Sequence, residues 1–343
     1  MGYRIGFDIG STTIKAVVLD ENNQICYKSY ERHKAQVRQK ALDKLVELKK
    51  YTKEPFKFAI SGSGALGLSE QGELPFVQDV FASATGVSKL YPETDCAIEL
   101  GGEDAKILFF QGSVEQRMNS TCAGGTGAFI DQMATLLNMS LEEMNEASLN
   151  YHRLYPIASR CGVFAKTDIQ PLINQGVDKC DLCASIFQAV VDQTITSLAQ
   201  GRKIEGNILF LGGPLYFMSG LRNRFVETLK LSDVQVNCPD TAINFVALGT
   251  AICADQEYTY DELYKALEDL VHAPAKLTES KPLFESDEDY QKFIERHKSH
   301  DAKFTDLKNY AGKAYLGIDS GSTTTKLVLL DENDAILYDS YTS

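Results

Sequence analysis

The stretch Asp8-Ile9-Gly10-Ser11-Thr12-Thr13-Ile14-Lys15 decides how this chain folds. Apolar, β-branched residues on either side of it predict two strands, at residues 4–8 and 14–20, joined by a glycine turn. Glycine lets the backbone approach a phosphate closely, and the neighbouring hydroxyl and N–H groups can donate to its oxygens. We therefore predict nucleotide-binding residues in this hairpin: Gly10, Ser11, Thr12, Thr13 and Lys15. A plain β-hairpin turn would look similar, so this stretch alone leaves both interpretations open.

A second hairpin of the same kind, Glu99-Leu100-Gly101-Gly102-Glu103-Asp104-Ala105-Lys106, follows about 90 residues later. Two acidic strand–glycine hairpins are what a two-lobed phosphate clamp needs. A third stretch, Leu211-Gly212-Gly213-Pro214, follows a short apolar strand, where a flat adenosine could lie against bare backbone. These stretches add further predicted nucleotide-binding residues: Gly101, Gly102, Lys106, Gly212, Gly213 and Pro214.

Carboxylates in both hairpins are the candidates for catalysis and for metal binding. Because Mg²⁺ takes oxygen ligands and keeps several of its waters, we predict that Asp8 and Glu99 hold it indirectly. The predicted catalytic residues are Asp8, Glu103 and Asp104. Strand–glycine–strand hairpins at both ends of the module, with helices between them, predict an α/β fold of two lobes that face a cleft.

In their order along the chain, the three stretches resemble the phosphate-1, phosphate-2 and adenosine motifs of the actin, sugar-kinase and heat-shock-chaperone superfamily. The resemblance implies two α/β lobes with a nucleotide cleft between them. It also implies that the γ-phosphate of ATP lies between the two hairpins, and that closing of the lobes couples the nucleotide state to the shape of the protein. Positioning, together with charge neutralisation by Mg²⁺, is the general physics of such a site.

The composition narrows the class of partner. The chain has 343 residues and a net charge of −13. Binding to nucleic acid or to an anionic membrane needs clustered Lys and Arg, so we expect neither. We see no signal-peptide pattern, and no apolar run near the roughly 18 residues that span a bilayer. We expect a cytoplasmic protein whose eight cysteines are thiols or metal ligands rather than disulfides.

An internal repeat sets the predicted domain organisation. Residues 6–27 and 317–338 are identical at 14 of 22 positions, at a constant offset of 311. We expect one whole ATPase module of two lobes at 1–272, a polar linker with a short helix at 273–313, and the truncated start of a second module at 314–343. We expect this chain to be a fragment of a longer protein that contains two such modules in tandem.

Two cysteines lie near the starts of predicted helices, Cys122 within residues 119–127 and Cys161 within residues 159–166. Backbone N–H groups at a helix start stabilise thiolates and an anionic cluster. A 4Fe–4S cluster needs four thiolates, so two cysteines per subunit suffice only if two subunits share one cluster. On the residue pattern alone, buried thiols remain the alternative.

The other cysteines give weaker signals. Cys180 and Cys183 form a C-x-x-C without a second pair at zinc-finger spacing, so thiols at the start of a buried helix over residues 184–200 are the favoured interpretation. Cys26, Cys96 and Cys253 fall in apolar patterns and are predicted core residues.

The surroundings of Cys122 and Cys161 resemble one family in particular, the ATP-dependent activators of 2-hydroxyacyl-CoA dehydratases, which are close to the ATPase subunits of benzoyl-CoA reductases. Together with the hairpins, the matching stretches are C-A-G-G-T-G-A-F (122–129), S-R-C-G-V-F-A-K-T-D (159–168), I-L-F-L-G-G-P (208–214) and A-L-G-T-A (247–251). The resemblance implies a homodimer that binds ATP or ADP and shares one 4Fe–4S cluster, with Cys122 and Cys161 as the ligands of each subunit. It further implies that ATP hydrolysis drives one low-potential electron to a dehydratase or reductase. A reduced ferredoxin or flavodoxin of an anaerobe is the expected donor.

Two positions depart from the family pattern, which usually has Asp where Glu99 stands and Gln where Glu103 stands. The longer Glu99 moves a metal-linked carboxylate, whereas Glu103 either slows hydrolysis by repelling the γ-phosphate or acts as a general base. A tandem chain could also pair its own two modules to build the four-thiolate site. Two other functions stay open: a small-molecule kinase of the same superfamily, and a redox-inactive, nucleotide-switched assembly protein.

Overall fold

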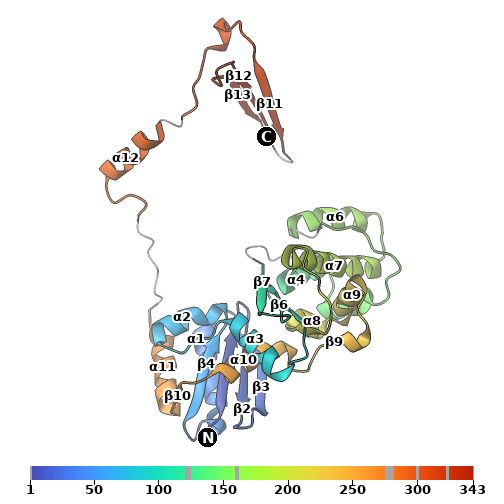
Figure 1. Cartoon of the computed structure of the whole chain (residues 1–343), viewed down its shortest axis with the longest axis vertical. Helices are drawn as coiled ribbons and strands as arrows, with labels where there is room; N and C mark the ends of the chain where they lie inside the picture. Colours follow the sequence, from blue (N-terminus) through green and yellow to red (C-terminus); the bar gives the residue numbers. More distant parts are fainter. Residues whose placement is uncertain are drawn as a thin grey trace. The chain divides into compact units, whose positions relative to one another are not determined.

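The computed structural model describes residues 2–119, 125–158, 162–274, 282–298, 301–321 and 324–342. These residues form two compact units, Met1–Pro274 and Ala275–Ser343. The first unit contains two five-stranded sheets, each with its own helices (Figure 1). It therefore has the two α/β lobes that the glycine hairpins predict.

The first lobe is built on a sheet with the strand order β10-β4-β1-β2-β3. Its strands are β1 Arg4–Ile9, β2 Thr13–Leu19, β3 Ile25–Arg32, β4 Phe56–Ser61 and β10 Glu257–Tyr258. Its helices are α1 Val37–Glu47, α2 Leu66–Gly72 and α11 Tyr260–His272, with 3-10 turns at Lys49–Tyr51 and Ser63–Ala65. Alternate residues of β1, Ile5 and Phe7, are buried in one core with Leu263 and Leu267 of α11. This is the pairing of a period-2 strand with the apolar stripe of a helix.

The second lobe is built on a sheet with the strand order β7-β6-β5-β8-β9. Its strands are β5 Cys96–Leu100, β6 Ala105–Phe109, β7 Glu115–Met118, β8 Ile208–Leu211 and β9 Val236–Asn237. Its helices are α4 Gly127–Leu137, α5 Leu141–Ser148, α6 Gly162–Asn174, α7 Lys179–Thr194, α8 Gly213–Phe217 and α9 Ser219–Leu229. A π-helical turn, Ile195–Ala199, continues α7, and a 3-10 turn lies at Asp233–Gln235. Phe187 and Val190 of α7 pack with Ile98 and Phe210 in the core of this lobe.

Two further helices join the lobes. These are α3 Asp79–Leu90 and α10 Phe245–Cys253, the second preceded by a 3-10 turn at Ala242–Asn244. A third core contains Val87 of α3 and Leu248 of α10, together with Val17 from the first sheet and Leu108 from the second. Buried apolar surface shared by both sheets makes α3 and α10 the structural link between the lobes.

The second unit repeats the first hairpin of the chain. Strands β11 Tyr315–Ser320, β12 Thr325–Leu330 and β13 Ile336–Thr342 form an antiparallel sheet, accompanied by α12 Asp287–Lys298 and a 3-10 turn at Leu307–Asn309. Asp319 pairs with Lys326 in this sheet as Asp8 pairs with Lys15 in the first lobe. The division into module, linker and second module remains a proposal, and α12 covers the part of the linker where the sequence predicts a helix.

Helix α7 differs from its prediction in two respects. It begins at Lys179 rather than at residue 184, because the Asp178 carboxylate accepts a hydrogen bond from the Cys180 N–H, at 2.7 Å, and caps the helix. Its continuous span Lys179–Ala199 has the length and composition of a membrane-crossing helix, contrary to the expectation from the sequence. However, 67% of the apolar window is buried inside the lobe, which is typical of a core helix.

The prediction that Cys26 is a core residue is wrong. Cys26 lies on β3, one of the two edge strands of the first sheet, and is exposed. Its apolar neighbours in the sequence alternate between the two faces of the strand, so only some of them reach the core. Cys96 is buried as predicted, and Cys253 is half-buried.

Candidate functional site

A single cleft in the first unit gathers most of the predicted nucleotide-binding residues. Its cavity volume is about 380 Å³, within the range of roughly 300–1,000 Å³ that small-molecule sites occupy. The predicted residues on its wall are Asp8, Thr12, Thr13, Lys15, Glu99, Gly101, Gly102, Gly212, Gly213 and Pro214. Five predicted residues are in the same hairpins but are not among the described residues that line the cleft: Gly10, Ser11, Glu103, Asp104 and Lys106.

The two predicted phosphate hairpins have the same turn and face each other. The Gly10 N–H donates to the Thr13 carbonyl at 2.9 Å, and the Gly101 N–H donates to the Asp104 carbonyl at 2.7 Å. A methyl group at Gly102 would lie 3.3 Å from the Thr12 hydroxyl oxygen. The tips of the turns are therefore in near contact, one from each lobe, as a phosphate clamp requires.

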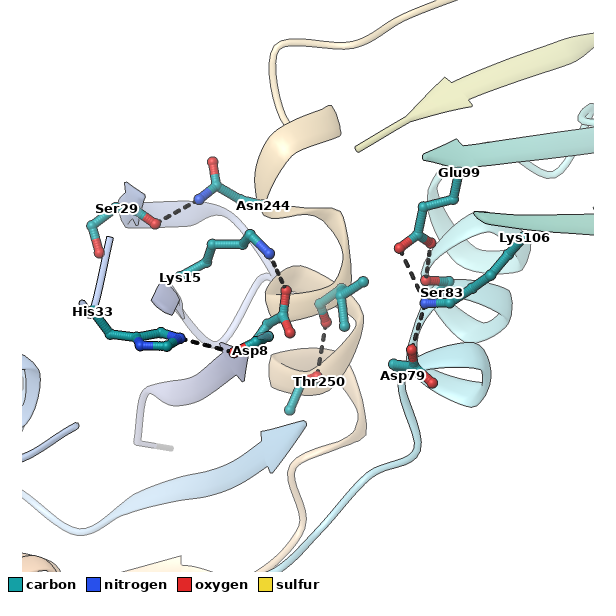
Figure 2. A network of polar contacts seen from close by, with 12 residues as sticks. Asp8, Lys15, Ser29, His33, Asp79, Ser83, Glu99, Lys106, Asn244 and Thr250 are labelled. Atoms are coloured by element: carbon teal, nitrogen blue, oxygen red, sulfur yellow. Dashed lines mark hydrogen bonds and ion pairs between the residues drawn. The ribbon is translucent and has the colours of Figure 1, made fainter. Parts of the chain in front are cut away.

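A carboxylate and a lysine lie opposite each other in both hairpins. Lys15 Nζ donates to Asp8 Oδ2 at 2.7 Å, and Lys106 Nζ donates to Glu99 Oε1 at 3.3 Å (Figure 2). Lys106 also donates to Asp79, the first residue of α3. Burial alone would lower the pKa of both lysines, but the neighbouring carboxylates raise it, namely Asp8 for Lys15, and Glu99 and Asp79 for Lys106. Both side chains are held as ammonium ions.

The carboxylates of the cleft suit a hydrated Mg²⁺ ion. Asp8 and Glu99 both line the cleft, one from each hairpin. Ser61 pairs with Asp8 in the parallel β1–β4 ladder, and its hydroxyl is buried with no hydrogen-bond partner among the described residues. The two carboxylates are oxygen donors of the kind that hold Mg²⁺ through its waters, whereas Ser61 is not among the described residues that line the cleft. Within the part of the chain that the structure describes, no three His, Cys, Asp or Glu converge for direct metal binding.

The remaining predicted catalytic residues lie in the phosphate-2 turn. Burial raises the pKa of the half-buried Asp104, against the opposing effect of Lys106, and neighbouring acids such as Asp79 raise it further. The Glu103 side chain is exposed, and its carbonyl accepts a hydrogen bond from the Asn119 side chain. The catalytic roles of Glu103 and Asp104 remain proposals.

Cys122 and Cys161 lie outside the described residues, so their predicted cluster site is untested by the structure. The chain on both sides of Cys122 is described. The Asn119 side chain accepts from the Ala105 N–H at 2.8 Å and donates to the Glu103 carbonyl at 3.2 Å. Beyond the cysteine, the first N–H groups of α4 also bond this hairpin, as Gly127 donates to Gly101 at 2.9 Å and Ala128 to Gly102 at 2.7 Å.

The chain beside Cys161 is also anchored. The Asp168 carboxylate of α6 accepts from the Ala158 N–H at 2.7 Å, one residue before the segment that contains the cysteine. Residue Gly162 is the first of α6. The Asp168 side chain, which belongs to the matching stretch 159–168, thus connects Ala158 to helix α6.

Several residues of the site carry no sequence motif and were not predicted. The cleft is also lined by Tyr30, Arg32, Asp131, Glu142, Phe217, Met218, Ile243 and Val246. His33 is buried, and its Nε2 lies 3.0 Å from the Gly10 carbonyl while its Nδ1 accepts from the Ala35 N–H. Because Nδ1 accepts, Nε2 carries the proton and donates to the phosphate-1 turn. Only the fold brings these side chains to the cleft.

This chain is similar in sequence and in structure to known dehydratase activators. The 2-hydroxyisocaproyl-CoA dehydratase activator of Clostridioides difficile is 27% identical over 266 residues, which are 76% of this chain and 96% of the activator. A solved structure of the activator of the 2-hydroxyisocaproyl-CoA dehydratase from Clostridium difficile, with bound ADPNP, is similar with a TM-score of 0.65 and 25% identity. The match covers 79% of this chain and 98% of the activator.

A second solved structure shows the same fold. Component A of the (R)-2-hydroxyglutaryl-CoA dehydratase of Acidaminococcus fermentans is similar with a TM-score of 0.66 and 24% identity, over 78% of this chain and all of that one. The predicted two-lobed ATPase fold is confirmed. The profile of the BadF/BadG/BcrA/BcrD ATPase family matches residues 5–254, which contain both hairpins, the adenosine motif and both cysteine stretches. The family resemblance is confirmed as well, and this chain belongs to the BadF/BadG/BcrA/BcrD ATPase family.

Proposed function

We propose that this chain is an ATP-dependent activator that uses ATP hydrolysis to drive one-electron transfer from a 4Fe–4S cluster to a partner. The partner would resemble a 2-hydroxyacyl-CoA dehydratase or an aryl-CoA reductase. The named activities of the relatives support this, since one activates 2-hydroxyisocaproyl-CoA dehydratase and another is a benzoyl-CoA reductase subunit. The ADPNP-bound relative supports ATP as the nucleotide.

The observation that supports the proposal is that the described residues on both sides of Cys122 are hydrogen-bonded to the phosphate-2 hairpin. Hydrogen bonds from Asn119 on one side, and from Gly127 and Ala128 on the other, bind both described ends of the segment to residues 101–105. A shift of this hairpin on binding or hydrolysis of ATP would therefore move the segment at both ends. Coupling through packed, hydrogen-bonded elements of this kind is the physical basis of communication between sites.

We further propose how the nucleotide uses the side chains of the cleft. The wall carries the charged side chains of Asp8, Lys15 and Glu99 from the two hairpins, where Mg²⁺ and the phosphates would bind. It also carries apolar side chains suited to a base, among them Phe217, Ile243 and Val246. Asp8 and Glu99 would hold the metal through water, and Lys15 would neutralise phosphate charge.

A 4Fe–4S cluster, when bound, supplies the low-potential electron. Cys122 and Cys161 would each give one thiolate, and a second copy of the module, in a homodimer or in a tandem chain, would give the other two. The proposed donor is a reduced ferredoxin or flavodoxin in the cytoplasm of an anaerobe. Glu103 would act on the γ-phosphate side, either as a general base or as a brake on hydrolysis.

Anaerobic reconstitution with iron and sulfide tests the proposal. We expect 4Fe–4S absorbance with about four iron atoms per two modules. Cys122→Ser or Cys161→Ser should abolish the absorbance and leave ATP affinity intact, while Cys26→Ser, at an exposed cysteine outside the matching motifs, should change neither. Colourless protein that phosphorylates a sugar would establish the kinase instead. Iron-free protein that assembles on addition of nucleotide would establish the assembly function.

A further inference from the structure

Helix α3 contacts the phosphate-2 hairpin with two polar side chains. Asp79 and Ser83 are four residues apart, and so they lie one turn apart on the same face of the helix. Lys106 Nζ donates to Asp79 Oδ2, and the Ser83 hydroxyl donates to Glu99 Oε2 at 2.8 Å (Figure 2). The remaining oxygen of Glu99 accepts from Lys106 at 3.3 Å. The four side chains form one hydrogen-bonded chain, in the order Asp79, Lys106, Glu99 and Ser83, and both of its ends lie on α3.

The two hairpins differ in how many carboxylates each lysine has. Among the described residues, Lys15 has one ion-pair partner, Asp8, whereas Lys106 has both Glu99 and Asp79. The Lys15 side chain is 18% exposed and lines the cleft, so bound phosphates could replace Asp8 as its counter-charge. The Lys106 side chain is 5% exposed and does not line the cleft, so phosphates in the cleft could not replace Glu99 there.

A buried ammonium that loses its counter-charge is strongly destabilised. If Glu99 were the sole partner of Lys106, bound Mg²⁺ and Lys106 would compete for the same carboxylate. Asp79 removes this conflict, because it keeps one carboxylate on Lys106 when Glu99 turns to the metal. Of the network's four side chains, Glu99 is the one that lines the cleft.

We propose that Asp79 is a positioning residue that neutralises Lys106 and thereby frees Glu99 to bind the hydrated Mg²⁺ of Mg·ATP. The inference rests on the proposed nucleotide function and adds a residue to it. It also accounts for the contacts of Glu99, whose carboxylate accepts hydrogen bonds from Ser83 and Lys106 at the same time. Asp79 acts through Lys106 and is not itself on the cleft wall.

The test compares ATP affinity with and without Mg²⁺ in the full chain, by titration calorimetry. The dissociation constant without Mg²⁺, divided by the dissociation constant with Mg²⁺, measures how much the metal contributes to ATP affinity. Asp79→Asn should lower this ratio roughly tenfold, within the usual range of coupling between two sites, and leave metal-free ATP affinity unchanged. Asparagine is chosen because Asp79 Oδ1 also accepts from the Val80 N–H at 2.8 Å, and asparagine serves equally well near a helix start.

Two further variants separate positioning from a merely structural role. The double variant Asp79→Asn with Lys106→Met should restore the ratio to within about twofold, because Glu99 then has no lysine to neutralise. Asp261→Asn, which removes an exposed carboxylate from the first turn of α11, is the matched control and should leave the ratio unchanged. An unchanged ratio in Asp79→Asn, or no recovery in the double variant, would overturn the inference alone. Absence of Mg·ATP binding by the unaltered chain would overturn the proposed function itself, and the inference with it.

Discussion

Gly127→Ala should loosen the contact between α4 and the phosphate-2 turn. A methyl group at Gly127 would lie 3.1 Å from the Gly101 carbonyl oxygen, 3.2 Å from Pro214 Cγ and 3.4 Å from Gly102 Cα. Two of these three neighbours are backbone atoms of the turn that faces the nucleotide, so the turn or the helix must shift. Overpacking of this kind costs about 1–3 kcal/mol, and weakening of two hydrogen bonds adds up to about 1 kcal/mol for each bond.

Thermal unfolding and ATP calorimetry measure the effect. For a unit of this size, a loss of about 2 kcal/mol lowers Tm by roughly 4–8 °C, and ATP affinity should fall in parallel because the turn has moved. Gly67→Ala is the matched control, since Gly67 lies in α2 with no atom within 4 Å of the added methyl group. It should raise stability by about 0.5–1 kcal/mol. Equal Tm values for Gly127→Ala and the unaltered chain, with equal ATP affinities, would refute this reasoning.

Three further variants follow from the site and its surroundings. Asp8→Ala should weaken Mg·ATP binding in calorimetry, and unchanged affinity would remove Asp8 from the site. His33→Ala deletes both ring hydrogen bonds, one to the Gly10 carbonyl of the phosphate-1 turn and one to the Ala35 N–H, so it should cost about 1–3 kcal/mol of stability and weaken ATP binding. Retained ATP affinity would show that the turn keeps its conformation without His33. Asp181→Asn should cost about 1–3 kcal/mol at neutral pH, because the Asp181 carboxylate accepts backbone hydrogen bonds from Arg153 and His152 that lower its pKa. That stabilisation is present above the unfolded pKa of about 3.9 and is lost as the pH falls through the lower folded pKa, so a difference that persisted unchanged into strong acid would contradict this assignment.

The strands and turns could be predicted from the sequence because local chemistry fixes them. Strands β1 and β2 begin and end within one residue of the predicted ranges 4–8 and 14–20, on either side of the Gly10 turn. Helix α7 was predicted too short, because its first turn is polar and its start depends on the cap at Asp178. Cys26 was misplaced because residue type does not reveal that β3 is an edge strand.

The cleft was predictable where one motif supplies both backbone and side chain, as at Asp8 and Lys15. It was not predictable where the contact joins segments that are distant in sequence. Asp79 reaches Lys106 across 27 residues, and His33 reaches Gly10 across 23. Neither residue belongs to a motif, and only packing of α3 and of the chain after β3 brings them to the hairpins.

In the proposed function, the nucleotide site controls the Cys122 segment through the phosphate-2 hairpin. The rate at which a chelator removes iron from the reconstituted protein tests it most directly. We expect a several-fold change in this rate on addition of Mg·ATP, and loss of that change in Gly127→Ala. Iron release at the same rate with and without Mg·ATP, in protein shown to bind the nucleotide, would contradict it.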